Sequence, residues 1–136
     1  MKTRVYHLTM AEDRMDDRAV REEYVKIRYD ANLDTLRSVV ARGTDAAVFF
    51  ENVAVVDGDL ETAWMLTQNR RDSWSIGNGQ DRSPRVTVTP EGERRIVEQD
   101  GYGLRSSDLG DLFVNEAGEV FMCATIGFNR IDGLKL

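Results

Sequence analysis

The sequence contains a single cysteine, Cys123, and a single histidine, His7, among its 136 residues. One cysteine excludes an internal disulfide and any zinc site with several cysteine ligands, and it is typical of a reducing compartment. The longest apolar run, residues 46–50, is far shorter than the ~18 residues that a membrane-spanning helix needs. The N-terminal segment also lacks the unbroken apolar core of a signal peptide. We therefore expect a cytoplasmic protein with no membrane partner.

An excess of positive charge is missing as well. The formal net charge is −6, and residues 1–68 hold nine Lys/Arg against thirteen Asp/Glu, while residues 69–136 hold nine against eleven. Affinity for the phosphate backbone needs a positive face, so this balance disfavours nucleic acid as a partner. Mimicry of DNA by an acidic surface is disfavoured too, because arginines interrupt almost every acidic cluster.

The composition that remains is that of one folded domain. Hydrophobic residues make up 41% of the chain and charged residues 31%, with only two prolines and no biased tract. A chain of this size buries roughly two thirds of its unfolded surface. No period of roughly 20 to 50 residues repeats, and no linker separates two apolar centres. We therefore predict a single domain over residues 1–136.

The first third of the chain predicts one strand and two helices. Polar and apolar residues alternate over residues 2–9, which is typical of a half-buried strand. From Met15 onward the apolar positions recur at helical spacing, with charged residues on the opposite face. A second helix follows between Asn32, which can cap its start, and Gly43, which can end it.

The middle of the chain predicts another strand and a short helix. Residues 46–56 are rich in Val and Phe and lead into a turn at residues 57–58, so we expect a core strand with an interruption near residues 51–52. Asp59 then opens a helix over residues 60–68, because a carboxylate at that position satisfies free amide groups of the first turn.

The last third predicts two hairpins. Val86 to Val88 leads through residues 90–92 to Ile96 and Val97, a pattern that favours two short strands joined by a turn. Residues 112–115 and 120–126 flank a second turn at residues 116–119 in the same way.

These elements predict an α+β fold. We expect two to three helices packed on one face of a mainly antiparallel sheet. The predicted core consists of Val20, Tyr24, Ile27, Leu36, Val39, Val40, Phe49, Val55, Leu60, Trp64, Leu112, Val114, Val120, Met122, Ile126 and Phe128.

Few residues in the chain fit a role in nucleophilic catalysis. Such chemistry needs a base that titrates near neutral pH, and His7 is the single candidate. A lone histidine in a strand is more often a packed structural residue, so we predict that role and no catalytic residue. Cys123 lies in an apolar stretch, where we predict a buried and inert thiol.

Metal and cofactor sites are not indicated either. The acidic residues before the first helix lack the central glycine of a calcium loop and are interrupted by arginines, so we interpret them as a solvated helix cap. The glycine pairs at residues 77–79 and 101–103 match no phosphate-binding loop, and we predict turns. A convergent carboxylate pair remains open, since any two of 24 acidic residues could meet in space. The acidic residues before the first helix, which we interpret as its solvated cap, are Glu12, Asp13, Asp16 and Asp17.

The polar segment from Gln68 to Arg85 is the candidate binding region. Arginine and tryptophan are enriched at binding hot spots, and long polar loops often carry recognition. The simpler interpretation, which we favour, is that the tryptophan packs on the core and the arginines only keep the loop solvated. The candidate binding residues are Arg70, Arg71, Trp74, Arg82 and Arg85.

Residues 104–114, with the sequence LRSSDLGDLFV, and the later Gly118–Phe121 and Ile126–Phe128 resemble a pattern of small actinobacterial phage and plasmid proteins. In those proteins an R-S-x-S-V-G-D stretch precedes a hairpin and a G-[FW] pair. The stretch at residues 59–64 and the later S-W pair at residues 73–74 also fit, so the resemblance covers roughly residues 53–131. This chain departs from the pattern at Asp108-Leu109, where Ser-Val is usual, and by a long insertion after Trp74.

The resemblance, which extends more distantly to YodL-like domains, implies a mobile-element origin and no established enzymatic activity. Its Gly110-Asp111 and Gly127 fit turns that hold the fold. Our leading hypothesis is a non-enzymatic phage- or plasmid-encoded protein that binds a host or phage macromolecule, most simply a protein. The alternatives are a DNA-associated regulator that uses the arginines of residues 70–85, and a small-ligand binder or enzyme at that loop.

Overall fold

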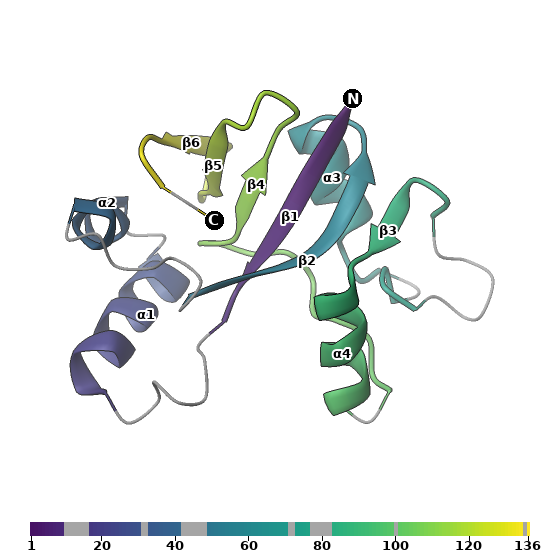
Figure 1. Ribbon diagram of the computed structural model, residues 1–136, viewed down its shortest axis with the longest axis horizontal. Helices are drawn as coiled ribbons and strands as arrows, with labels where there is room; N and C mark the ends of the chain where they lie inside the picture. The colour runs from purple at the N-terminus through teal and green to yellow at the C-terminus, as the bar shows by residue number, and fades with distance from the viewer. Residues whose placement is uncertain are drawn as a thin grey trace.

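The computed structural model describes residues 1–9, 17–30, 33–41, 49–70, 73–76, 83–99, 101–134 and 136. Its strands form one six-stranded sheet in the order β3-β2-β1-β4-β5-β6, and every neighbouring pair is antiparallel (Figure 1). The strands are β1 (Lys2–Leu8), β2 (Phe50–Asp57), β3 (Val86–Val88), β4 (Leu112–Val114), β5 (Val120–Cys123) and β6 (Phe128–Ile131). The helices are α1 (Arg18–Asp30), α2 (Leu33–Ala41), α3 (Leu60–Leu66) and α4 (Pro90–Glu98).

Strand β1 lies in the middle of the sheet, between β2 and β4. Val5 pairs with Ala54 and Tyr6 pairs with Asn52, so Val53 is an extra residue on β2. Such a β-bulge bends the strand and increases its twist. The expected interruption of this strand is therefore a bulge within a continuous β2.

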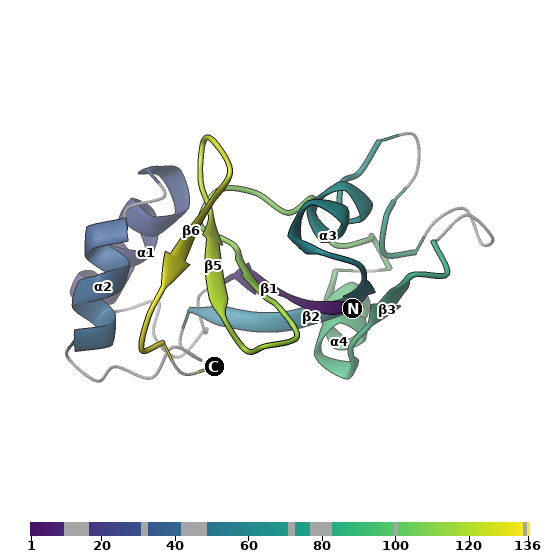
Figure 2. The same ribbon diagram turned by 90° about the horizontal axis from the view of Figure 1, so that it is seen from above.

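The sheet has a core on each face. Successive residues of a strand point to opposite faces, and Val5 belongs to one apolar cluster while Tyr6 belongs to the other. The first cluster includes Ile27 of α1 and Leu36 of α2, and the second includes Ala63 of α3 together with residues of α4. The α+β class and the antiparallel sheet are confirmed, but the helices cover both faces, not one. Figures 1 and 2 show α1 and α2 at one end of the sheet, and α3 and α4 toward the other.

The prediction of the first hairpin is wrong. Its first strand forms as β3, but the segment expected to be its second strand is part of helix α4. Thr89 caps the helix by accepting a hydrogen bond from Gly92 N at 3.0 Å, and Pro90 occupies the first turn, where its missing N–H does no harm. Gly92 serves helix packing rather than a turn. A Cβ atom at Gly92 would lie 2.5 Å from the carbonyl oxygen of Val53, so glycine lets α4 pack closely against β2.

Most other expectations are confirmed within the described residues. The strand at β1, both N-terminal helices, the helix at α3 and the β4–β5 hairpin form as predicted. Two core predictions are wrong: Ile126 is 91% exposed at the turn before β6, and Trp64 is 38% exposed on α3. Asn32 and Gly43 lie outside the described residues, as do the side chains of Val39 and Val40.

Candidate functional site

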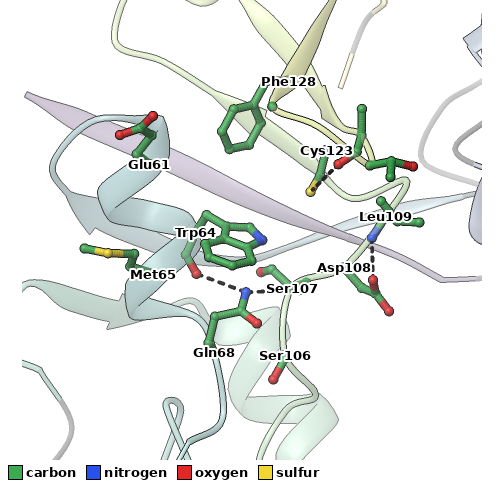
Figure 3. Close-up of a pocket in the computed structure, with 13 residues that line it drawn as sticks. Glu61, Trp64, Met65, Gln68, Ser106, Ser107, Asp108, Leu109, Cys123 and Phe128 are labelled. Atoms are coloured by element: carbon green, nitrogen blue, oxygen red, sulfur yellow. Dashed lines mark hydrogen bonds between the residues drawn. The ribbon is translucent and has the colours of Figure 1, made fainter.

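A groove of about 710 Å³ lies between α3 and the turn that joins β5 to β6 (Figure 3). Helix α3 contributes Glu61, Trp64 and Met65, the opposite wall includes Cys123 and Phe128, and residues 106–109 close one side. Figure 3 shows the Trp64 indole within this groove, with Phe128 and Cys123 across from it. We call this feature the α3 groove.

Local sequence positions the two sides of the α3 groove. Asp59 accepts a hydrogen bond from Thr62 N at 2.9 Å and so starts α3 as predicted; the same bond lowers the pKa of Asp59. On the opposite side, Gly127 adopts φ +69° and accepts a hydrogen bond from Ala124 N at 3.0 Å, which closes the turn. Phe128 then packs edge-on against Phe113, with ring centroids 5.3 Å apart.

Exposed apolar side chains lie at the α3 groove together with two carboxylates. Met65 is 52% exposed, and the exposed Ile126 lies between Thr125 and Gly127, which both line the groove. The two charged side chains that line it, Glu61 and Asp108, are both acidic. Asp108 pairs with Arg28 at 3.3 Å, whereas Glu61 has no ion-pair partner in the part of the chain that the structure describes.

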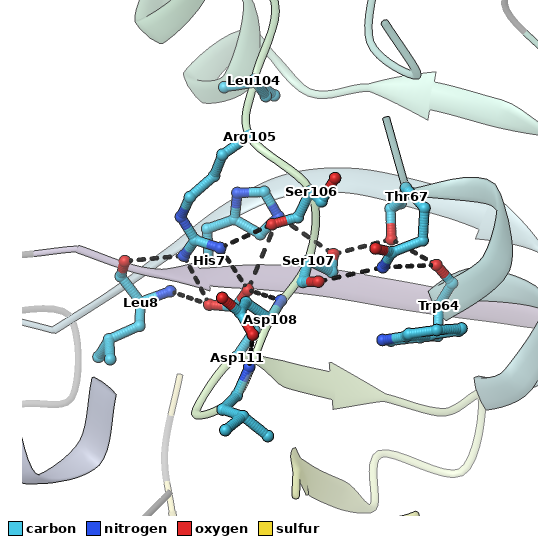
Figure 4. Close-up of polar contacts among 12 residues, drawn as sticks. His7, Leu8, Trp64, Thr67, Leu104, Arg105, Ser106, Ser107, Asp108 and Asp111 are labelled. Carbon is cyan, nitrogen blue, oxygen red and sulfur yellow. Dashed lines mark hydrogen bonds and ion pairs between the residues drawn. The ribbon is translucent and has the colours of Figure 1, made fainter. Parts of the chain in front are cut away.

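Behind the groove wall, Asp111 is fully buried at the entry to β4 and bonded through both carboxylate oxygens (Figure 4). Arg105 donates to both oxygens at 2.7 Å, Leu8 N donates to Oδ1 at 2.7 Å, and Asp108 N donates to Oδ2 at 2.8 Å. Gly110, at φ +84°, makes the turn that precedes Asp111, in agreement with its predicted role. Asp111 thus ties β1 to the segment that lines the groove.

His7 joins the same network through its Nε2 atom. This atom lies 3.1 Å from Ser107 Oγ and 4.0 Å from Asp111 Oδ2, and Ser107 Oγ lies 2.7 Å from Thr67 Oγ1. The nearby carboxylate favours a proton on Nε2. The hydrogen bonds then run in one direction, from His7 to Ser107, from Ser107 to Thr67, and from Thr67 to Ala63 O at 2.8 Å.

This direction does not suit a catalytic Ser-His-Asp arrangement. In such a triad the histidine accepts the serine proton on one nitrogen and donates to the carboxylate from the other. Here Nε2 faces both Ser107 and Asp111, so His7 donates to the serine and cannot act as its base. Cys123 is buried as predicted, and burial raises the pKa of its thiol to about 11, which disfavours the reactive thiolate.

The candidate residues of the 70–85 segment are not gathered into one site. Trp74 is 5% exposed and donates from its indole nitrogen to Arg105 O at 2.7 Å, so it packs in the core. Arg70 is exposed, and the Arg85 side chain donates to Asp57 O at 2.8 Å. Within the described part of the chain, no hydrogen bond or ion pair joins Arg70, Trp74 and Arg85. Arg71 and Arg82 lie outside the described residues.

The network residues Thr67, Arg105 and Ser107 were not predicted as a group from the sequence. Their partners are up to 100 positions away along the chain, and no local spacing indicates such a contact. The only signal was the Gly110-Asp111 pair, which was correctly interpreted as a structural turn. Of the predicted acidic cap, Asp17 caps α1 by accepting from Ala19 N at 3.0 Å, and the other three residues lie outside the described ones.

Comparison with family models, with curated proteins and with solved structures gives no match for this chain. Among the described residues, no group of three or more His, Cys, Asp or Glu side chains is arranged to hold a metal ion. None of the described helices is long and apolar enough to cross a membrane.

The buried His7 predicts a pH dependence of stability. Burial lowers the pKa of His7 from 6.5 to about 4, and Asp111 offsets this only in part. Between pH 6.5 and 4, His7 binds a proton in the unfolded chain but stays neutral in the folded protein. The free energy of unfolding therefore falls as the pH drops from 6.5 toward 4. The full change from this group is about 3 kcal/mol. Urea denaturation at pH 7, 5.5 and 4.5 measures it.

The His7→Gln variant is the matched control, because a Gln amide nitrogen can still donate to Ser107 but does not titrate. We expect this variant to lose the His7 contribution to the pH slope while keeping the contribution of the carboxylates. Equal slopes for the two proteins would contradict the assignment of a neutral, buried His7.

Proposed function

We propose that this chain is a non-enzymatic binding protein that docks a short segment of a partner protein in the α3 groove. The observation that carries the proposal is a groove of about 710 Å³ lined by the exposed apolar side chains of Trp64 and Met65, with the exposed Ile126 in the turn on its opposite side. Exposed apolar surface around a concave site is typical of protein–protein contacts, and tryptophan and methionine are enriched there. A cytoplasmic accessory protein of phage or plasmid origin, with a host or phage protein as partner, fits this role.

The charges of the α3 groove indicate the chemistry of the partner. Glu61 and Asp108 are acidic, and no basic side chain lines the groove among the residues that the structure describes. A partner segment with a large apolar anchor next to a Lys or Arg side chain would therefore fit better than an acidic segment. The same charges disfavour a nucleic acid strand in this groove, because its phosphates would face two carboxylates.

The proposal predicts a specific outcome of a peptide selection. Random peptides displayed on phage and selected on the immobilised protein should converge on sequences with an apolar anchor and a neighbouring basic residue. Fluorescence anisotropy with a labelled selected peptide then gives the affinity. Trp64→Ala should weaken binding at least about tenfold, since an aromatic anchor at an interface contributes on the order of 2 kcal/mol.

Val97→Ala is the matched control for this measurement, because Val97 is also exposed but lies on α4 and does not line the groove. It should bind the peptide as the unmodified protein does. Selection that yields no converging peptide, or peptides whose affinity is unchanged in Trp64→Ala, would contradict the proposal.

A further inference from the structure

A second, smaller cavity of about 210 Å³ lies among β1, α1, α4 and the segment at residues 104–105. It shares no lining residue with the α3 groove. The side chains of His7, Tyr24, Glu51, Arg95 and Arg105 converge on it. We call it the His7 cavity. Its volume is below the ~300 Å³ at which pockets for drug-sized molecules begin, so it suits a molecule of only a few heavy atoms.

His7 presents an unused hydrogen-bonding atom at this cavity. The residue is 5% exposed, and its polar contacts with Ser107 and Asp111 both use Nε2 (Figure 4). Nδ1 has no hydrogen-bond partner among the described residues. With the proton on Nε2, Nδ1 is an acceptor that is available to a donor in the cavity that His7 lines.

The other lining groups are donors with unused capacity. Arg95 donates from Nε and Nη2 to the Glu51 carboxylate. Arg105 donates from Nη1 and Nη2 to Asp111 and to backbone oxygens. Within the described part of the chain this leaves Arg95 Nη1, Arg105 Nε and the Tyr24 hydroxyl without partners.

Guanidinium groups outnumber carboxylates among the residues that line the His7 cavity. The Glu51 carboxylate is shared by two guanidinium groups, those of Arg94 and Arg95, and the charge of Arg105 is balanced by Asp111 behind the wall. Arg94 also pairs with Glu98 at 2.8 Å, so its charge is shared between two carboxylates. The cavity itself is small and polar, and two guanidinium groups and one carboxylate line it. Such a site favours a small anion.

We infer that the His7 cavity binds a small hydroxycarboxylate, with the carboxylate on the free donors of Arg95, Arg105 and Tyr24 and the hydroxyl donating to His7 Nδ1. This assignment satisfies the unused donors and the unused acceptor at the same time. A simple carboxylate would leave Nδ1 without a partner, so it should bind more weakly. The inference is independent of the proposed peptide docking, since the two sites share no lining residue.

The single histidine makes the test direct, because a ¹⁵N-labelled sample gives one set of imidazole signals. Before ligand is added, the signals should report the tautomer with the proton on Nε2. Titration with glycolate should shift the Nδ1 signal with a Kd on the order of 1 mM, and acetate, which lacks the hydroxyl, should bind several times more weakly. No Nδ1 shift with glycolate up to about 100 mM would overturn the inference.

Two arginines that share one partner provide matched variants. Arg94 and Arg95 both pair with Glu51, but only Arg95 lines the cavity. Arg95→Met should weaken glycolate binding about tenfold or more, whereas Arg94→Met should bind it as the unmodified protein does. Tyr24→Phe, which removes only the hydroxyl, should weaken it severalfold. Equal loss in the Arg94 and Arg95 variants would overturn the assignment.

Discussion

Asp111→Ala should lower the free energy of unfolding by about 3–5 kcal/mol, the loss expected when one partner of a buried ion pair is removed. The carboxylate is fully buried and accepts hydrogen bonds from Arg105, Leu8 N and Asp108 N. Without it, the Arg105 guanidinium and two backbone N–H groups lose their acceptor in a buried site. Urea denaturation at pH 7 measures the effect through the midpoint and the slope of the transition.

Asp108→Ala is the control for this variant. The Asp108 side chain is 57% exposed and pairs with Arg28, and exposed pairs contribute about 1 kcal/mol or less. Asp111→Asn should fall between the two, since the amide keeps one acceptor oxygen but cannot neutralise Arg105. If Asp111→Ala were no more destabilising than Asp108→Ala, Asp111 would not organise the wall of the α3 groove.

Trp74→Ala should also destabilise the protein by about 3–5 kcal/mol, as the removal of a buried aromatic side chain does. Trp74 packs edge-on against His7, with ring centroids 5.9 Å apart, and its indole nitrogen donates to Arg105 O. The variant therefore loses buried apolar area and leaves a carbonyl oxygen without its donor.

Trp64→Ala is the natural comparison, because the chain has two tryptophans and they lie in opposite environments. Trp64 is 38% exposed on α3, so Trp64→Ala should lower the free energy of unfolding by only about 1 kcal/mol. Denaturation of both variants under one condition checks the contrast. Equal losses of stability would mean that Trp64 is as much a core residue as Trp74.

Local patterns in the sequence predicted most of the elements because each one carries its own signal. The apolar spacing of α1, the Asp59 cap of α3 and the Gly118 turn of the β4–β5 hairpin are all set by residues close in the chain. Helix α4 was missed because Pro90 and Gly92 are typical of turns. Their actual roles, in the first helical turn and at a close contact with Val53, depend on Thr89 and on tertiary packing.

The sites were harder to predict because they depend on contacts between distant segments. The α3 groove brings α3 together with residues 106–109 and 123–128, and the buried network joins His7 to Ser107. Ile126 has the apolar character of a core residue, and only the turn at Gly127 places it in solvent. Composition alone also drew attention to Trp74, whose buried position follows from packing against β1 residue His7.

The location of the binding surface is tested most directly by the two indole N–H signals in a ¹⁵N spectrum. A selected peptide is titrated into the labelled protein, and the signals of Trp64 and Trp74 are followed together. The α3 groove predicts that the Trp64 signal shifts while that of Trp74, held by Arg105 O, stays in place. A shift of Trp74 and of residues 70–76, with Trp64 unchanged, would contradict the account and assign recognition to the arginine-containing loop.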